Sequence, residues 1–159
     1  MHSSHRNLRN RDKHMEIYTI GFTQKSAETF FTLLADHEIT LLADIRLRPG
    51  GQLSGFSKGS DLAFFLDRLC NGCRYLHMPL LAPTKDILDG YRRDEDWARY
   101  ERRFRGLLDE RKIPQALDKA LFANNRVCML CSEATPDQCH RRLVAERLAR
   151  AWEAKVVHL

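Results

Sequence analysis

Five short segments rich in apolar and β-branched residues alternate with segments in which apolar residues recur at helical spacing. The two most apolar segments, residues 40–46 and 126–131, have few polar side chains before their ends. Such strands are typical of a parallel sheet that is covered on both faces. The sequence therefore predicts an α/β fold: a single three-layer domain over residues 16–159, with a mainly parallel sheet of about five strands and helices on both faces. The other expected strands are 16–20, 73–77 and 155–159, and the expected helices are 26–37, 60–69, 94–111, 115–123 and 136–153.

The first 15 residues differ from the rest of the chain in charge. They hold four basic residues and one acidic residue, which accounts for +3 of the net charge of +5. The remaining chain has 22 basic and 20 acidic residues and is nearly balanced. We expect a disordered basic arm, or a remnant of cloning or of an upstream start, with Met15 as the natural start. A native basic arm would be able to contact phosphates.

Composition also bears on location and partners. No apolar run approaches the ~20 residues that span a bilayer, and the N-terminus lacks the apolar centre of a signal peptide. Five cysteines, an odd number, favour free thiols in a reducing compartment. We expect a cytoplasmic protein without a membrane partner, and the sequence indicates no particular oligomeric state.

The stretch after residues 126–131 concentrates reactive side chains. Thr135 is a good N-cap, Pro136 suits a first helical position and Gln138 completes a capping box, so a helix is predicted from residue 136. The N-terminus of a helix favours an anion or a thiolate. The reactive side chains in and beside this loop are Cys131, Glu133, Cys139, His140 and Arg141.

Helical phase separates these side chains. Counted along the predicted helix, His140 and Arg141 flank the apolar stripe, whereas Cys139 falls near the solvated side. An arginine directed inwards requires an anionic partner, which would be Glu133, Asp44 or a ligand. An internal salt bridge and a bound anion explain the predicted inward direction of Arg141 equally well.

The carboxyl ends of parallel strands meet at one edge of a sheet, where the ligands of such folds bind. Asp44 and Arg46 share a strand face at that edge, so they either pair with each other or act as a base and an anion clamp. The alternative for Cys131 is an inert buried thiol, as expected for Cys128. We assign catalytic roles to Cys131, Glu133, His140 and Asp44, and substrate binding to Arg46, Arg141, Thr23, Tyr75 and His77.

Cysteine spacing gives little support for a metal site. Two Cys-x-x-Cys pairs, which begin at Cys70 and Cys128, are separated by 54 residues, far from the spacing of a zinc ribbon. We predict no metal or other cofactor. The alternative that remains open is zinc held by Cys131, Cys139 and His140.

Several separated motifs occur in the order typical of one bacterial and archaeal family. They are Thr19-Ile20-Gly21-Phe22-Thr23, Asp44-Ile45-Arg46 with Pro49, Phe56-Ser57, Tyr75-Leu76-His77-Met78-Pro79-Leu80, and Leu130-Cys131-x-Glu133 followed by Cys139-His140-Arg141. On these motifs the chain resembles the family called domain of unknown function 488, over essentially all of residues 16–159. The resemblance implies a compact α/β domain with a polar rim, but no activity. Leu81-Ala82 stands where the family usually has Leu-Gly-Gly.

A weaker likeness links the Asp-Ile-Arg strand end and the Cys131 loop to rhodanese and cysteine phosphatase domains. Their active loop carries an arginine six residues after the cysteine. This chain has Asp137 at that position, so the likeness does not extend to their phosphate-binding loop.

Together these features predict an enzyme with an anion-binding polar site at the C-terminal rim of the sheet. The expected substrate is a nucleotide, a nucleic-acid component or another phosphorylated small molecule, and the expected reaction is hydrolysis or transfer. The alternatives are a non-catalytic nucleic-acid-binding module and a thiol or zinc regulatory protein.

Overall fold

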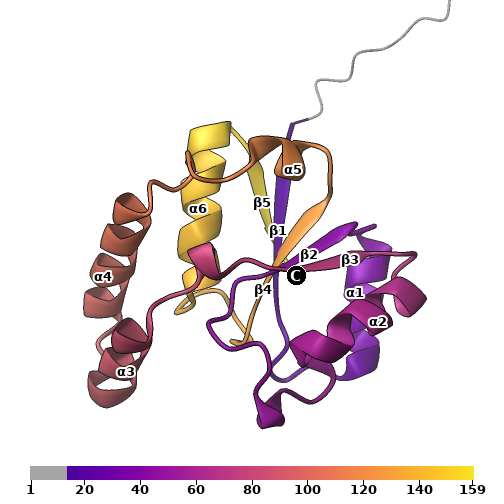
Figure 1. Cartoon of the computed structure of the whole chain (residues 1–159), viewed down its shortest axis with the longest axis horizontal. Coiled ribbons are helices and arrows are strands. Elements are labelled where there is room, and N and C mark those ends of the chain that lie inside the picture. The colour runs from indigo at the N-terminus through magenta and orange to yellow at the C-terminus, as the bar shows by residue number, and fades with distance from the viewer. Residues whose placement is uncertain (1–13) are drawn as a thin grey trace, which may run out of the picture.

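A five-stranded parallel sheet lies at the centre of the molecule in the computed structural model (Figure 1). The structure describes residues 14–159, apart from the side chains of residues 52–54. The strand order is β3-β2-β4-β1-β5, and every neighbouring pair is parallel. The strands are β1 (Glu16–Gly21), β2 (Leu41–Asp44), β3 (Arg74–His77), β4 (Val127–Cys131) and β5 (Lys155–His158). All five predicted strands are confirmed, with ends that differ by at most a few residues.

Helices cover both faces of the sheet, as predicted. The connections from β1 to β2 and from β2 to β3 run one way across the sheet and contain α1 (Ala27–Asp36) and α2 (Gly59–Leu69). The connection from β4 to β5 runs the other way and contains α6 (His140–Trp152). Because parallel crossovers are right-handed, opposite directions put the helices on opposite faces. The long connection from β3 to β4 holds α3 (Lys85–Asp94), α4 (Trp97–Glu110) and α5 (Lys119–Ala123).

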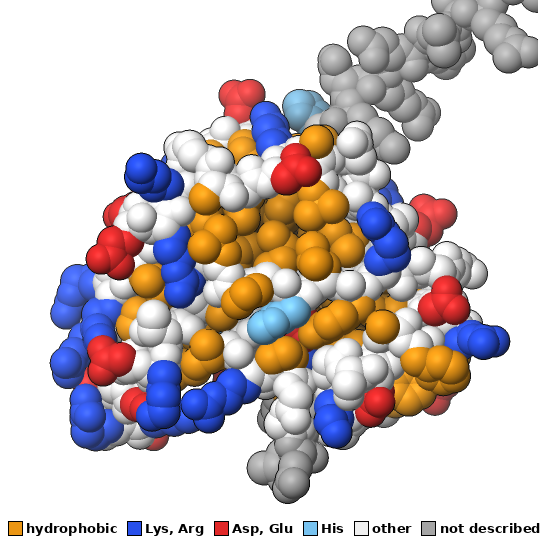
Figure 2. Space-filling model, in the orientation of Figure 1, with side chains coloured by type: hydrophobic (Ala, Val, Ile, Leu, Met, Phe, Trp, Pro, Cys, Tyr) orange, Lys and Arg blue, Asp and Glu red, His pale blue; other side chains and the backbone are white. Residues whose placement is uncertain are grey.

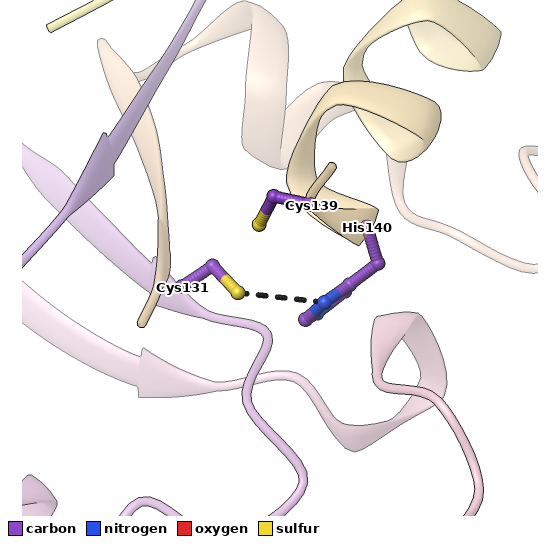
Figure 3. Close-up of side chains that lie close together, drawn as sticks. All are labelled: Cys131, Cys139 and His140. Atoms are coloured by element: carbon purple, nitrogen blue, oxygen red, sulfur yellow. Dashed lines mark hydrogen bonds between the residues drawn. The ribbon is translucent and has the colours of Figure 1, made fainter. Parts of the chain in front are cut away.

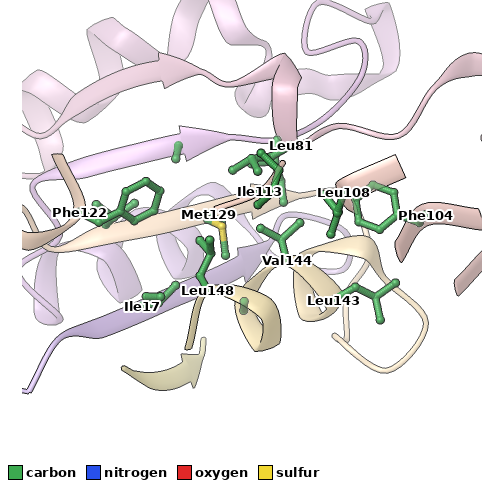
Figure 4. Close-up of a cluster of buried hydrophobic side chains, with 14 of the residues drawn as sticks. Ile17, Leu81, Phe104, Leu108, Ile113, Phe122, Met129, Leu143, Val144 and Leu148 are labelled. Carbon is green, nitrogen blue, oxygen red and sulfur yellow. The ribbon is translucent and has the colours of Figure 1, made fainter. Parts of the chain in front are cut away.

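Two hydrophobic clusters fill the space between the layers. On the α6 face, Met129 of β4 packs with Val144 and Leu148 of α6, and the cluster extends to Phe104 of α4 (Figure 4). On the opposite face, the neighbouring strand residues pack against α1 and α2. Successive residues of a strand point to opposite faces, so each apolar strand serves both clusters. Full burial of one such side chain contributes about 1.5–3 kcal/mol.

α3 was not among the expected helices. Thr84 caps α3, and its Oγ1 accepts a hydrogen bond from the backbone N–H of Ile87 at 3.3 Å. The side chain of Ile87 is buried against the α6-face cluster. Pro83 precedes the cap and so does not interrupt the helix. The expected helix 94–111 is present as α4, which begins at Trp97 with Asp96 as its cap, and α3 is an additional helix before it.

The helix after β4 begins four residues later than predicted. α6 starts at His140 with Cys139 in the N-cap position, and residues 132–138 form a loop. Arg141 donates hydrogen bonds to two backbone carbonyls of this loop, and Arg142 Nε donates to the carbonyl of Asp137 at 3.2 Å. These tertiary contacts outweigh the local capping signals of residues 135–138.

Two other helix starts also differ from expectation. α2 begins at Gly59 with Lys58 as its N-cap residue, instead of after Ser60. α5 is shorter than the expected 115–123 because Asp118 caps it and accepts a hydrogen bond from the backbone N–H of Ala120 at 2.9 Å. Neither difference alters the layers of the fold.

The basic arm predicted for residues 1–15 lies outside the described residues, apart from His14 and Met15. The carbonyl of Met15 accepts a hydrogen bond from the backbone N–H of Lys155 at 2.8 Å, which extends the pairing of β1 with β5 by one bond. Within the described part of the chain, no helix has the length and apolar character needed to cross a membrane.

Leucine truncation on α2 tests the packing of this face. Leu66 is fully buried and Leu69 is 53% exposed on the same helix. We expect Leu66→Ala to lower the free energy of unfolding by about 2–5 kcal/mol, because it leaves a cavity in the core. Leu69→Ala, the matched control, should change it by about 0.5 kcal/mol or less. Urea denaturation measures both, and equal effects would contradict the packing described.

Candidate active site

The sheet topology leaves a crevice beyond the carboxyl ends of β2 and β4. These strands are neighbours, but α2 after β2 and α6 after β4 lie on opposite faces. Open α/β sheets bind their ligands where two neighbouring strands are followed by helices on opposite faces, which is called the topological switch point. A cavity of about 560 Å³ lies there, lined by the segments after β2 and β4, the start of α6, and residues of α3 and α4. The prediction that strand ends form a common polar rim is confirmed for β2 and β4.

Two cysteines and a histidine form the floor of this cavity. Cys131 ends β4, and Cys139 and His140 stand at the start of α6. All three line the cavity, and each side chain is at most 6% exposed. The Sγ atoms of both cysteines and a ring nitrogen of His140 lie within 4.8 Å of one another, and the side chains point toward one another (Figure 3). We call these three residues the floor cluster.

The ring of His140 is held in one orientation. Its Nε2 lies 2.8 Å from the backbone carbonyl of Ile45, and its Nδ1 lies 3.4 Å from Cys131 Sγ. A carbonyl only accepts, so Nε2 carries a proton, and Nδ1 is the ring nitrogen that faces the sulfur. The ring of Phe104 packs edge-on against the imidazole, with centroids 5.4 Å apart.

The two thiols of the floor cluster differ in acidity. A hydrogen bond from Cys139 lowers the pKa of Cys131, and this outweighs its burial; the backbone N–H groups of Ser132 and Glu133 and the charge of Arg141 act in the same direction. The pKa of Cys139 is raised, first by its hydrogen bond to Cys131 and then by burial. Cys131 is therefore the sulfur that carries negative charge more readily.

Cys139 was predicted near the solvated side, and that prediction was wrong. It is 2% exposed and belongs to the floor cluster. The phase count assumed a helix from residue 136, whereas Cys139 is the N-cap and has extended backbone angles. A side chain outside the helix does not follow helical phase.

Arg141 lies behind the floor and not among the residues that line the cavity. It is fully buried, and its guanidinium donates to the carbonyls of Glu133 and Ala134 and to Cys139 Sγ at 3.7 Å. Among residues 14–159, no ion pair joins it to the carboxylate of Glu133 or Asp44, the protein partners that the sequence suggested. Arg141 therefore fixes the loop and faces the thiols. Its Nε has no hydrogen-bond partner among the described residues.

Gly21 allows the same loop to approach β1. A Cβ atom at this position would lie 1.7 Å from the backbone oxygen of Glu133 and 2.7 Å from Arg141 Nη1. Glycine at this position thus permits a close backbone approach that a larger residue would prevent. Thr23, predicted to bind substrate, is exposed, and its backbone N–H donates to the carbonyl of Ser132 at 3.1 Å. It does not line the cavity.

Asp44 and Arg46 form a buried ion pair at 2.6 Å. Asp44 is fully buried and accepts four hydrogen bonds: three from Arg46 and one from the hydroxyl of Tyr75 at 2.7 Å. Burial and this contact raise the pKa of Tyr75. Asp44 has no oxygen directed into the cavity, so its geometry supports a structural role instead of the catalytic one predicted.

The same network anchors Arg46, which does line the cavity. Arg46 Nη2 also donates to the carbonyl of Ser57 at 2.7 Å, and its guanidinium lies over the ring of Phe22. His77 Nε2 lies 2.8 Å from the carbonyl of Arg46. Tyr75 and His77, predicted to bind substrate, thus support the Arg46 segment from behind.

Basic and aromatic side chains from distant parts of the chain complete the cavity. Four basic and two acidic side chains line it, and Lys and Arg residues crowd the side of the molecule where α3 and α4 lie (Figures 1 and 2). Asp89 pairs with Lys85 and, at 3.7 Å, with Arg92. Of the predicted site residues, the cavity brings together Cys131, Glu133, His140 and Arg46.

Sequence reasoning missed the part of the cavity wall that α3 forms, because no helix was expected between residues 69 and 94. The cap at Thr84 and the helical spacing of Ile87, Leu88 and Tyr91 were signals for that helix. The missed lining residues include Arg48, Lys85, Asp89, Tyr91, Arg92, Trp97, Tyr100 and Gln138.

Comparison with known proteins identifies the family. The family model described as "Domain of unknown function DUF488" matches residues 26–148, which is most of the chain. The chain belongs to this family. The matched residues include every lining residue of the cavity and the whole floor cluster. Neither the curated proteins nor the solved structures contain a match to this DUF488 chain.

The Asp44–Arg46 pair should contribute strongly to stability. We expect Asp44→Ala to lower the free energy of unfolding by about 3–5 kcal/mol, because it leaves a buried guanidinium without its counter-charge. Tyr75→Phe removes one hydrogen bond to the same carboxylate and should cost about 0.5–1.5 kcal/mol. Chemical denaturation measures both. An Asp44→Ala protein as stable as Tyr75→Phe would refute the role given to this pair.

Gly21→Ala tests the contact between β1 and the Cys131 loop. The added methyl group overlaps backbone atoms, so we expect a loss of about 1–3 kcal/mol in the free energy of unfolding and displacement of residues 132–134. Gly50→Ala is the control, because a Cβ at Gly50 meets no atom within 4 Å. Thermal unfolding and amide NMR shifts of residues 131–141 provide the measurements. Unchanged shifts in Gly21→Ala would contradict the close approach.

Proposed function

We propose that this protein is an enzyme that binds a small anionic substrate in the cavity between β2 and β4 and acts on it at the floor cluster. The substrate class that fits is a nucleotide, a nucleic-acid component or another phosphorylated small molecule. One observation carries the proposal: a cavity with more basic than acidic side chains ends on a buried Cys-Cys-His cluster.

The size and lining of the cavity support a small-molecule ligand. Its volume of about 560 Å³ falls within the range of about 300–1,000 Å³ that is usual for ligand pockets. The rings of Tyr91, Trp97 and Tyr100 contribute to its lining, and they pack with centroids 5.0–5.9 Å apart. Aromatic rings beside cationic groups suit a substrate that joins a flat apolar part to an anionic part.

The lining residues divide into binding and reacting groups. Arg48, Lys85 and Arg92 are exposed at the cavity and are the groups that would contact phosphate or carboxylate oxygens. Arg46 is fixed by Asp44 and presents a charge that is already positioned. Glu133 is exposed in the lining and is the carboxylate that would carry a proton to or from the substrate. Hydrolysis or group transfer is the reaction class that these groups serve.

A nucleic-acid-binding module remains the second candidate, and less supports it. Several arginines of α4 and α6 outside the cavity are paired with carboxylates, including Arg99, Arg105, Arg142 and Arg147. Such pairing reduces the charge available for a phosphate backbone. All five cysteines are free and buried, which is compatible with the cytoplasmic location that we propose.

Binding of inorganic phosphate and of AMP, measured by calorimetry at low salt, tests the proposal. We expect saturable binding to the wild-type protein that weakens as salt rises. Arg48→Ala and Arg92→Ala should each weaken binding by about tenfold or more, since each removes a charge-assisted hydrogen bond.

Arg93→Ala is the matched control, because Arg93 is exposed on the same helix as Arg92 but does not line the cavity. Its affinity should stay within about twofold of wild type. The proposal is refuted if neither probe binds the wild-type protein, or if Arg93→Ala weakens binding as much as Arg92→Ala does.

A further inference from the structure

The floor cluster contains the donor atoms of a soft metal site. Two sulfurs and one imidazole nitrogen converge, and Cys131 Sγ lies 3.4 Å from His140 Nδ1. In tetrahedral zinc sites, Zn–S bonds of about 2.3 Å and Zn–N bonds of about 2.0–2.1 Å place such atoms roughly 3.5 Å apart. One edge of the required tetrahedron is therefore already present, and the remaining donor, Cys139 Sγ, lies within 4.8 Å of both atoms.

Contacts around the cluster favour cation binding by two of its donors, His140 and Cys139. Because His140 Nε2 donates to the carbonyl of Ile45, the free lone pair is on Nδ1, which faces the sulfurs. Histidines that bind metals usually donate their second ring N–H to a carbonyl or carboxylate in this way. Arg141 Nη1 donates to Cys139 Sγ, and a hydrogen bond of this kind stabilises a thiolate ligand.

The other cysteines lie outside this arrangement. Cys70, Cys73 and Cys128 are buried in the hydrophobic cluster on the α1–α2 face of the sheet. Cys128 and Cys131, which the sequence pairs as Cys-x-x-Cys, therefore do not share a site. Among the described residues 14–159, the floor cluster is the group of three or more His, Cys, Asp or Glu side chains whose ligand atoms lie close enough together to hold one metal ion.

We infer that Cys131, Cys139 and His140 form a binding site for a single zinc ion, with the fourth coordination position open to the cavity. Two thiolates and one imidazole are a donor set that favours zinc, and each ligating thiol gives its proton to solvent. The inference rests on the proposed function in one respect, because the anionic substrate bound in the cavity would be the group that reaches the open position. A zinc ion there would polarise a phosphoryl or carbonyl oxygen, or lower the pKa of a bound water.

Metal titration of the full chain tests the site. The protein is reduced, stripped with chelator and titrated with Co²⁺ and Zn²⁺, while visible absorption and elemental analysis follow binding. We expect one ion per chain, with Co²⁺ bands typical of tetrahedral thiolate ligation. Cys139→Ser and His140→Ala should each weaken Zn²⁺ binding by about 100-fold or more, and Cys73→Ala should leave it within about twofold of wild type.

Circular dichroism checks that each variant is folded. If His140→Ala does not fold, the test uses Cys139→Ser, which is the milder change. The zinc site is refuted if the reduced wild-type protein binds no ion, if the cluster variants bind as well as Cys73→Ala, or if Co²⁺ binds without thiolate bands. Phosphate binding measured on the metal-free protein separates the two proposals. Phosphate binding without zinc binding refutes the zinc site alone, and zinc binding without phosphate binding refutes the proposed substrate class alone.

Discussion

The buried guanidinium of Arg141 is the contact on which the arrangement of the site depends. It donates to the carbonyls of Glu133 and Ala134, and it holds their loop against Gly21, where no side chain would fit. Because of this contact, α6 begins at His140 instead of at residue 136, and Cys139 occupies the N-cap position. As a result, both residues face Cys131 across the end of β4. The charge of the guanidinium that donates to these two carbonyls also favours the thiolate form of Cys131.

Sheet topology decides where the floor cluster opens. β2 and β4 are neighbours whose following helices lie on opposite faces, so a crevice forms beyond their ends. Arg46 enters this crevice from β2, anchored by Asp44. The long connection from β3 to β4 then adds a basic and aromatic wall through α3 and α4. The enzyme proposal depends on this joint geometry, since the wall would bind the substrate and the floor cluster would act on it. The zinc proposal depends on the floor cluster.

The sequence predicted the parts of the fold and site that depend on local pattern. Apolar runs indicated all five strands, and strand ends pointed to Arg46, Cys131 and Glu133. It failed where tertiary contacts overrule local signals. Thr135 and Pro136 favour an earlier helix start, but the hydrogen bonds of Arg141 prevent it, so Cys139 was placed wrongly. Asp44 was assigned as a base, with pairing to Arg46 as the alternative. The folded chain forms that pair and adds a hydrogen bond from Tyr75 of another strand to the same carboxylate.

X-ray absorption spectroscopy of the zinc-loaded protein tests the central claim most directly: the floor cluster is a reaction centre that opens to the cavity. The account predicts two sulfur neighbours at about 2.3 Å, one imidazole nitrogen at about 2.0–2.1 Å and one further light atom in the open position. Added phosphate should alter the light-atom part of the spectrum while the sulfur distances stay fixed. A shell of oxygen and nitrogen alone, or of four sulfurs, would contradict the account.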